Sequence, residues 1–474
     1  MEKLKYFLEG DSLIVFNVST VELLRFRGKI IDKIPKLLPE NYTERQLKNF
    51  IDAVNAIQNE NARNQLLRLT NTYHEEVGTG QRESMVISFA PIHKCNLRCK
   101  YCFADGGRNY QGKEREIDRK TLEKIFQFVL NEYAPACKDL LVNLVSGGEP
   151  FLGLELCTHI NEIINSINPN IKRKIYIATN LTIFNNEIED YLKLINPQLG
   201  ISIDGNQAMH DANRVYEAGG GSYEKVQENL LKLKGSNVLS AKTKDCLFMT
   251  VVTEDNLDLV EVLKHHKELH ATGVQMKVAR ETDYGNKGIS EKNIEKFENA
   301  YERLAEFLFD ECKKGNFEYL KMILNTTDYF GKFIRALMLG EANFYRCGAG
   351  RDKLSFNAEG DIYPCDNFMG NLEFKLGNIF EGGIIDQRFF GYNVDMMETC
   401  SKCWARHVCS GDCHFNAYIK TRDVTKPSPV MCHFYKKIIT LAIKLIIGIQ
   451  AEKPEEYRRL CRSLEVRSRN NAIQ

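Results

Sequence analysis

Three cysteines lie close together in the segment HKCNLRCKYCFADGG, and their spacing is the strongest chemical signal in the chain. Three residues separate Cys95 from Cys99, and two separate Cys99 from Cys102. One loop with this spacing can present three thiolates to one metal centre, and dense thiolate ligands select iron–sulfur clusters or zinc. A [4Fe–4S] cube normally takes four cysteines, so a cube held by three keeps one iron open for another ligand. A zinc site completed by His93 is the alternative.

A second dense set of cysteines occupies the C-terminal third of the chain. The set contains Cys347, Cys365, Cys400, Cys403, Cys409, Cys413 and Cys432. In a reducing compartment, clustered cysteines with short fixed spacings indicate metal ligands rather than disulfides. The four cysteines between positions 400 and 413 would also suit one tetrahedral zinc ion, so zinc stays open here as well.

The elements that must position the first cysteine loop follow a βαβ pattern. Short apolar runs alternate with helical patterns from position 84 to about 280, which is typical of a parallel sheet. Strands are expected at 85–90, 140–145, 174–179, 199–203, 246–252 and 274–278. Active sites of parallel barrels lie at the carboxyl ends of the strands. The cysteine loop follows the first expected strand, and Gly147-Gly148-Glu149-Pro150 follows the second. Glycine lets the backbone approach a ligand closely.

The first 75 residues or so form a separate module. Two apolar runs flank Gly10 and Asp11, which predicts a hairpin. The patterns Ser19-x-x-Glu22 and Thr43-x-x-Gln46 resemble capping boxes, and each predicts the start of a helix. The stretch 55–82 is rich in Asn, Gln and charge, and we expect a helix followed by a linker.

Length and composition set the broader limits. A chain of 474 residues should divide into several domains, because single cores stop growing at about 250–300 residues. A net charge of +1 gives no reason to expect nucleic acid or an anionic membrane as a partner. The N-terminus lacks an apolar signal core, and the longest apolar stretch, 438–449, is short and interrupted by Lys444. We therefore expect a cytoplasmic protein.

The cysteine loop, with Tyr101 just before its last cysteine, resembles the signature of the radical S-adenosylmethionine (SAM) enzymes. The resemblance implies an α/β fold with a partial (β/α)6 barrel. It also implies that the open iron binds SAM and that an electron from the cluster cleaves SAM to a 5′-deoxyadenosyl radical. Ordinary turn and capping roles stay open for Asn180 and Asp204. The SAM-binding residues implied are Tyr101, Gly147, Gly148, Glu149, Asn180 and Ser202.

The seven C-terminal cysteines resemble those of the SPASM domain, which holds two auxiliary [4Fe–4S] clusters, so three clusters are expected in all. The resemblance assigns Cys400, Cys403, Cys409 and Cys432 to the outer cluster, and Cys347, Cys365 and Cys413 to the inner one. Fully ligated members have an eighth cysteine shortly before the position of Cys347, but the segment LGEANFYRC has none there. An open iron is therefore expected. The cysteines outside both sets are expected to pack in the interior, but one of them could supply the fourth ligand of the inner cluster instead. They are Cys312, Cys137, Cys157, Cys246 and Cys461.

The expected function is that of a radical SAM/SPASM peptide maturase of the sactipeptide and ranthipeptide type, which joins a cysteine sulfur to a carbon. Iron deprotonates a bound thiol, so a substrate thiolate would lie within reach of a carbon radical. Oxidation or carbon–carbon or carbon–oxygen cross-linking of a side chain, including sulfatase maturation, is the second candidate. A non-catalytic iron–sulfur or zinc scaffold is the third. The residues indicate no general base.

The resemblance also implies partners and boundaries. Residues 1–75 resemble the winged-helix-like modules that bind the leader of a ribosomal precursor peptide by adding a strand to a sheet edge, although a plain cap over the barrel fits equally well. An electron donor such as flavodoxin or ferredoxin is expected. The radical SAM barrel is expected at 84–310, a bridging region with the SPASM domain at 311–440, and a helical tail at 441–474.

Overall fold

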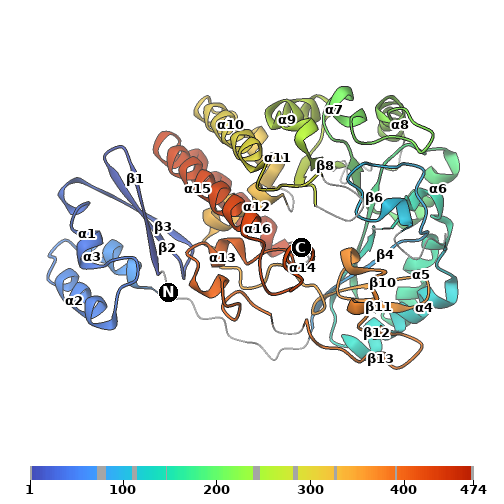
Figure 1. Cartoon of the computed structure of the whole chain (residues 1–474), viewed down its shortest axis with the longest axis horizontal. Coiled ribbons are helices and arrows are strands. Elements are labelled where there is room, and N and C mark those ends of the chain that lie inside the picture. The colour runs from blue at the N-terminus through green and yellow to red at the C-terminus, as the bar shows by residue number, and fades with distance from the viewer. Residues whose placement is uncertain are drawn as a thin grey trace. The chain divides into compact units, whose positions relative to one another are not determined.

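The computed structural model describes residues 3–71, 82–108, 115–145, 147–236, 238, 246–280, 287–324, 328–389 and 392–470. The chain divides into two compact units (Figure 1). Unit 1 contains Met1–Gly78, Lys332–Arg346 and Tyr392–Glu465. Unit 2 contains Thr79–Gly331, Cys347–Gly391 and Val466–Gln474.

Unit 2 is built on a ten-stranded sheet with the order β13-β12-β11-β10-β4-β5-β6-β7-β8-β9. The six strands from β4 to β9 run parallel. They are β4 (Ser84–Phe89), β5 (Asp139–Leu144), β6 (Lys172–Thr179), β7 (Gln198–Ser202), β8 (Cys246–Val252) and β9 (Gly273–Val278). All six expected strands are present, with their ends shifted by two residues at most. The predicted α/β fold with a mostly parallel sheet is confirmed.

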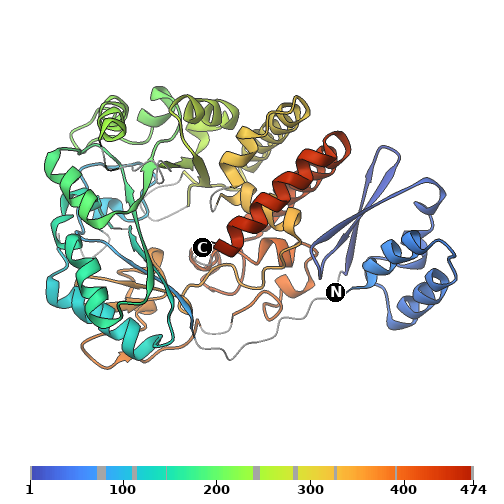
Figure 2. The same cartoon turned by 180° about the vertical axis from the view of Figure 1, so that it is seen from behind.

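Helices follow these strands along the outer side of the sheet (Figures 1 and 2). Most of them bury an apolar face, as α9 does with Leu259, Val262 and Leu263, whereas the short α7 buries only His210. Along β5 and β8 buried residues alternate with half-buried ones, so one face of these strands is fully covered and the other is partly open. The helices are α4 (Arg119–Gln127), α5 (Ile160–Ile167), α6 (Asn186–Ile195), α7 (Gln207–Asp211), α8 (Tyr223–Gly235), α9 (Leu259–Glu268), α10 (Ile294–Lys313) and α11 (Glu318–Leu324).

Four short strands after Cys347 extend the sheet beyond β4. β10 (Lys353–Phe356) pairs parallel to β4, and β11 (Asp361–Tyr363), β12 (Gly377–Asn378) and β13 (Gly383–Ile384) follow in antiparallel order. Nothing in the sequence predicted this extension. It places the segment after Cys347 next to the strand that carries the first cysteine loop.

Unit 1 begins with an antiparallel sheet of three strands, β1 (Leu4–Glu9), β2 (Ser12–Asn17) and β3 (Glu22–Arg27). The predicted hairpin at Gly10 and Asp11 is confirmed, with Gly10 at a φ of +57°. The helix predicted from Ser19-x-x-Glu22 is wrong. The sequence ELLRFR alternates, so Leu24 and Phe26 enter the core while the backbone pairs with β2.

Three helices follow this sheet: α1 (Ile34–Leu37), α2 (Glu44–Asn55) and α3 (Glu60–Leu67). The capping box predicted at Thr43 and Gln46 is confirmed at the start of α2, where both reciprocal hydrogen bonds form. The predicted helix in the stretch 55–82 is present as α3, whereas the expected linker falls largely outside the described residues.

The sheet of unit 1 is covered on both faces. Leu13 and Val15 pack on one side, in a core that includes residues of α2 and α3. On the other side, the rings of Phe7 and Phe16 contact the ring of Trp404 edge-on, with centroids 5.9 and 6.0 Å apart. His407 also forms a hydrogen bond of 2.9 Å with the carbonyl oxygen of Val18. The N-terminal module is therefore packed against the segment that contains Cys403 and Cys409.

The rest of unit 1 is helical, with α13 (Arg406–Cys409), α14 (His414–Thr421), α15 (Pro429–Glu452) and α16 (Pro454–Asn470), while α12 (Tyr329–Leu339) crosses between the units. α15 continues through residue 440, where we expected the tail to begin, because its apolar positions continue without a break. A search of the described helices finds none that is long and apolar enough to cross a membrane.

Candidate functional site

The cysteine loop leaves the carboxyl end of β4, and its three cysteines are half-buried. Burial raises the pKa of Cys95 and of Cys99 to about 12, and the nearby Cys102 thiol raises both. Backbone N–H groups point at two sulfurs, from Leu97 to Cys95 and from Gly106 to Cys102, each at 3.4 Å. Three neighbouring soft ligands with N–H donors fit an iron–sulfur cluster, which displaces the thiol protons when it binds.

The ligands of an iron–sulfur cluster are arranged differently from those of a single metal ion. Among the residues that the structure describes, no three His, Cys, Asp or Glu side chains converge on a point that would hold one metal ion. A [4Fe–4S] cube binds each thiolate through a different iron, so its ligands lie around the cube and do not converge in this way.

The Gly147-Gly148-Glu149 loop packs directly on the cysteine loop. A Cβ atom on Gly148 would lie 2.2 Å from the carbonyl oxygen of Ile92 and 2.5 Å from that of Lys94. The backbone N–H of Glu149 donates to the same Lys94 oxygen at 2.7 Å. Only glycine permits this approach, so the loops after β4 and β5 form one rigid edge.

The carboxylate of Glu149 links the second loop to the third strand. It is 2% exposed and accepts hydrogen bonds from the hydroxyl of Thr179, from the backbone N–H of Asn180 at 2.7 Å and from that of Phe151 at 3.1 Å. Burial raises its pKa to about 7, although these hydrogen bonds oppose the rise. The carboxylate thus connects the loop after β5 to the end of β6. Its contact with SAM, which the resemblance implies, stays a prediction.

Asn180 and Ser202 lie at the same edge. Asn180 follows β6, and its amide nitrogen donates to Asn96 at 3.0 Å and to the sulfur of Cys95 at 3.7 Å. Ser202 ends β7 and is half-buried, one strand further along the sheet. The edge therefore brings together the cysteine loop, the glycine loop, Asn180 and Ser202.

A buried charge network beside Cys99 was missed by the sequence reasoning. The hydroxyl of Tyr101 donates to Asp204, and the guanidinium of Arg214 donates to both oxygens of the same carboxylate, at 3.0 and 3.3 Å. The guanidinium lies 5.4 Å from the Tyr101 ring and lowers the pKa of Cys99 against the effect of burial. Arg214 and Asp204 lie ten residues apart on either side of α7, so no short sequence motif predicts that they pair.

The four cysteines expected to hold the outer auxiliary cluster lie together in unit 1. Burial raises the pKa of Cys400 and of Cys432 to about 12, and Cys403 and Cys409 add to the rise in both. Burial raises the pKa of Cys409 to about 11 against the opposing charge of Arg346, which donates to the carbonyl oxygen of Cys409 at 2.9 Å. Four neighbouring thiols fit a fully ligated cube, and the cluster itself stays a prediction.

Two of the expected inner-cluster cysteines belong to unit 2. Burial lowers the pKa of Lys353, but Asp366, Cys365 and Cys347 together raise it to about 12. Asn367 donates to the sulfur of Cys365 at 3.9 Å. The third expected ligand, Cys413, belongs to unit 1, so the complete ligand set stays a prediction.

This region of unit 2 also touches the first cysteine loop. Ala104, Tyr363 and Met369 form a buried cluster, against which Cys102 and Phe103 pack. The five unassigned cysteines have local surroundings of their own: Cys157, Cys246 and Cys312 are buried, Cys137 donates to the carbonyl oxygen of Asp139, and Cys461 donates to that of Met338.

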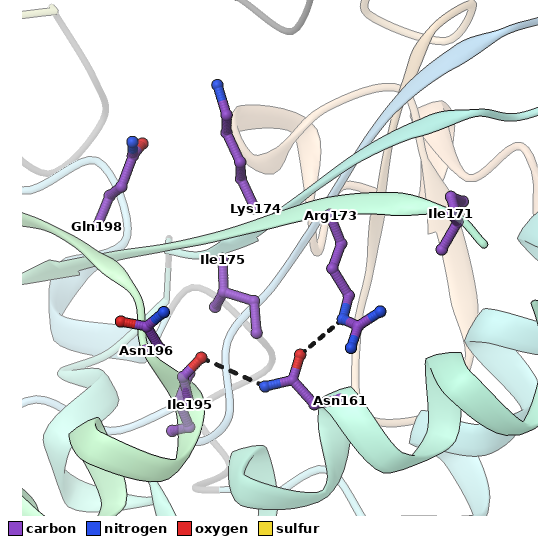
Figure 3. A pocket seen from close by; sticks show the side chains of 8 residues that line it. All are labelled: Asn161, Ile171, Arg173, Lys174, Ile175, Ile195, Asn196 and Gln198. Carbon is purple, nitrogen blue, oxygen red and sulfur yellow. Dashed lines mark hydrogen bonds between the residues drawn. The ribbon is translucent and has the colours of Figure 1, made fainter. Parts of the chain in front are cut away.

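A cavity of about 600 Å3 opens elsewhere on unit 2, at the amino ends of β6 and β7. Figure 3 shows its lining, in which Arg173 donates to Asn161 at 2.8 Å and Asn161 donates to the carbonyl oxygen of Ile195 at 3.3 Å. It lies at the opposite ends of the strands from the cysteine loop, so it is separate from the candidate site.

Comparison with known proteins defines the class. Residues 89–266 match the model of the radical SAM superfamily, a range that begins at the end of β4 and ends in α9. The chain therefore contains a radical SAM domain, a class that uses a [4Fe–4S] cluster and SAM.

Two similar proteins are named for the maturation of sulfatases and for the biosynthesis of a bacteriocin. The cysteine-type anaerobic sulfatase-maturating enzyme of Clostridium perfringens (strain ATCC 13124) is 25% identical over 379 residues, which cover 75% of this chain and 95% of that protein. The antilisterial bacteriocin subtilosin biosynthesis protein AlbA of Bacillus subtilis (strain 168) is 24% identical over 340 residues, 70% of this chain and 65% of that protein.

Solved structures show the same fold. The structure of anSMEcpe with bound AdoMet, which is SAM, has a TM-score of 0.60 at 22% identity and covers 77% of this chain and 99% of that one. Streptococcus suis SuiB bound to the precursor peptide SuiA has a TM-score of 0.51 at 15% identity and covers 91% of this chain and 98% of that one. The chain thus contains a radical SAM domain at residues 89–266 and has a fold similar to these structures.

Proposed function

We propose that this protein forms thioether bonds between a cysteine sulfur and a carbon atom in a ribosomally made precursor peptide. The observation that carries the proposal is the pair Cys347 and Cys365 beside Lys353, preceded by a segment with no further cysteine. An auxiliary cluster held there with one open iron would bind a substrate thiol as thiolate. The ammonium of Lys353 favours that negative charge.

The relatives support a peptide substrate. One takes part in the biosynthesis of the bacteriocin subtilosin, and SuiB is bound to a precursor peptide. Several others mature sulfatases, which favours oxidation of a protein side chain as the second candidate. Under either candidate we propose flavodoxin or ferredoxin as the electron donor and three [4Fe–4S] clusters.

A bound first cluster with SAM would supply the radical chemistry that removes a hydrogen atom from the acceptor carbon. Cys95, Cys99 and Cys102 would hold the cluster, and the Gly148 backbone and the Glu149 carboxylate hold the loops together. Formation of a thioether removes a hydrogen atom from the carbon and a proton from the thiol, and the remaining electron would pass to the auxiliary cluster.

The N-terminal sheet supplies a docking edge for the leader of that precursor. The outer edge of β1 is already covered, since the N–H groups of Leu4 and Tyr6 donate to the backbone and side chain of Glu40. The edge we assign to the leader is β3. The carbonyl oxygen of Arg25 there already accepts a hydrogen bond from Gln65, but Arg25 and Arg27 add positive charge that suits an acidic leader.

Co-expression with a cysteine-rich precursor encoded beside the gene tests the proposal. Intact mass and thiol alkylation are then measured. Loss of two mass units per blocked cysteine, with resistance to disulfide reductants, is the expected result for a thioether. Mass loss with every cysteine still open to alkylation would reject thioether formation and favour the second candidate. An unchanged precursor, together with no 5′-deoxyadenosine from SAM and dithionite, would reject both.

A further inference from the structure

Three polar side chains close a ring beside Cys95. Asn96 Nδ2 donates to Thr182 Oγ1 at 2.7 Å, and this hydroxyl donates to Asn180 Oδ1 at 2.7 Å. Asn180 Nδ2 completes the ring by donating to Asn96 Oδ1 at 3.0 Å. The second hydrogen of this amide nitrogen points to the sulfur of Cys95, 3.7 Å away.

The ring fixes the direction of the Asn180 amide. The backbone N–H of Thr182 also donates to Asn180 Oδ1, at 2.9 Å, so both lone pairs of this oxygen face Thr182. Rotation of the amide by 180° would turn its oxygen toward Asn96 Oδ1 and toward the sulfur, where it would meet acceptors. Asn180 and Thr182 are 7% and 5% exposed, so water has little access to replace these bonds.

We propose that Asn180 is a positioning residue for the SAM-binding cluster and makes no contact with SAM. Both hydrogens and both lone pairs of its amide are already used within the protein, which leaves no capacity for a ligand. The N–H that faces Cys95 stabilises negative charge on the thiolate, and hydrogen bonds to cluster sulfurs set the reduction potential. Thr182 acts through Asn180 by holding the amide in place. The inference deepens the proposed function and rests on it for the presence of the cluster.

The test is an EPR redox titration of the reconstituted full-length protein. The cluster signal followed is the one that changes when SAM is added, which separates it from any auxiliary cluster. Asn180→Leu removes the donor, and we expect a lower midpoint potential with the SAM dissociation constant unchanged. Thr182→Val releases the amide, and we expect a smaller shift in the same direction. The double variant should match Asn180→Leu alone, because the two residues act as one unit.

Two controls separate this role from a general structural one. Thr182→Ser keeps the hydroxyl that Thr182→Val removes, so its midpoint potential should equal that of the wild type. The comparison of these two variants tests the inference even if Asn180→Leu does not fold. Thr440→Val removes a hydroxyl that donates only to the carbonyl oxygen of Lys436 on the exposed side of α15, and should shift nothing.

Three results would overturn the inference: an unchanged potential in Asn180→Leu, a weaker affinity for SAM in that variant, or additive shifts in the double variant. The thioether proposal fails separately. A wild-type enzyme that leaves the precursor unmodified would reject it, while the potential shifts would still be measured without any peptide.

Discussion

The carboxylate of Glu149 accepts a hydrogen bond of 2.7 Å from the backbone N–H of Asn180, and this bond joins the loop after β5 to the end of β6. Burial raises the pKa of Glu149 to about 7, above its ordinary value of 4.5. Between pH 4.5 and about 7, the carboxyl group of Glu149 therefore keeps its proton in the folded protein but has lost it in the unfolded chain. Stability should fall as the pH rises through this window.

Glu149→Gln tests this linkage because its amide does not titrate. As the pH rises from about 4.5 to 7, we expect the melting temperature of the wild-type protein to fall relative to that of the variant. Above this range, the difference between the two melting temperatures should stay constant. Melting temperatures of the two proteins across this range measure the effect. A constant difference between them at every pH would contradict it.

Gly148→Ala should damage the site through the backbone alone. The added Cβ would lie 2.2 Å from the carbonyl oxygen of Ile92, so the two loops must separate, at a cost of about 1–3 kcal/mol or more. We expect a lower melting temperature and reduced iron content after reconstitution. Gly235→Ala is the matched control, because a Cβ there meets nothing within 4 Å. Equal iron content in the two variants would show that the close approach is unimportant.

The pair of Asp204 and Arg214 is buried, so removing one charge should cost more than removing one hydrogen bond. Asp204→Asn leaves the Arg214 guanidinium without its counter-charge and should cost about 3–5 kcal/mol. Tyr101→Phe removes only a hydroxyl and should cost about 1 kcal/mol. Denaturant unfolding of both variants measures these values.

Glu228→Gln, which breaks exposed ion pairs with Lys225 and Lys232, is the control for this comparison and should leave stability almost unchanged. If Asp204→Asn were as mild as this control, the buried pair would not be a structural requirement of the cysteine loop.

How much of this could be read from the sequence depends on the range of the interactions. The six parallel strands were predictable because their apolar runs are local signals, and the cysteine loops because ligand spacing is local too. The segment from Ser19 to Glu22 misled because a capping pattern competes with strand pairing, which only the partner β2 decides. The ring of Asn96, Asn180 and Thr182 joins two loops 84 residues apart, and single polar residues carry no sign of such contacts.

Trp404 is the single tryptophan of the chain and lies against Phe7 and Phe16 of the N-terminal sheet, so its fluorescence reports on this module. We expect an acidic leader peptide that adds to β3 to change this emission with a salt-dependent affinity. Arg25→Glu should weaken binding, since it reverses a charge on the β3 edge.

Lys5→Glu on the opposite edge, where Lys5 pairs with Glu40, is the matched control and should leave affinity unchanged. Equal loss in both variants would indicate a non-specific charge effect. Point variants are sharper here than deletion of residues 1–75, because deletion removes the partners of Trp404 and exposes apolar surface in unit 1.

Lys353 offers the most direct test of the auxiliary site. Its ammonium pairs with Asp366 and lies beside Cys365 and Cys347, where positive charge favours a bound thiolate. The double variant Lys353→Met/Asp366→Asn removes the charge without leaving a lone carboxylate. We expect 5′-deoxyadenosine formation to continue while cross-linking of the precursor falls by at least tenfold, which corresponds to about 1.4 kcal/mol.

Lys375→Met is the control for this pair of changes, since Lys375 forms an ion pair with Asp361 in the same segment but is not among the charges that act on Lys353. Mass spectrometry of the precursor and chromatography of 5′-deoxyadenosine separate the two activities. Full cross-linking in the double variant would show that thiolate binding does not depend on this ammonium. Loss of both cross-linking and 5′-deoxyadenosine formation would instead indicate that Lys353 and Asp366 support the cysteine loop expected to bind SAM. This loop packs against Tyr363 and Met369 of the same segment.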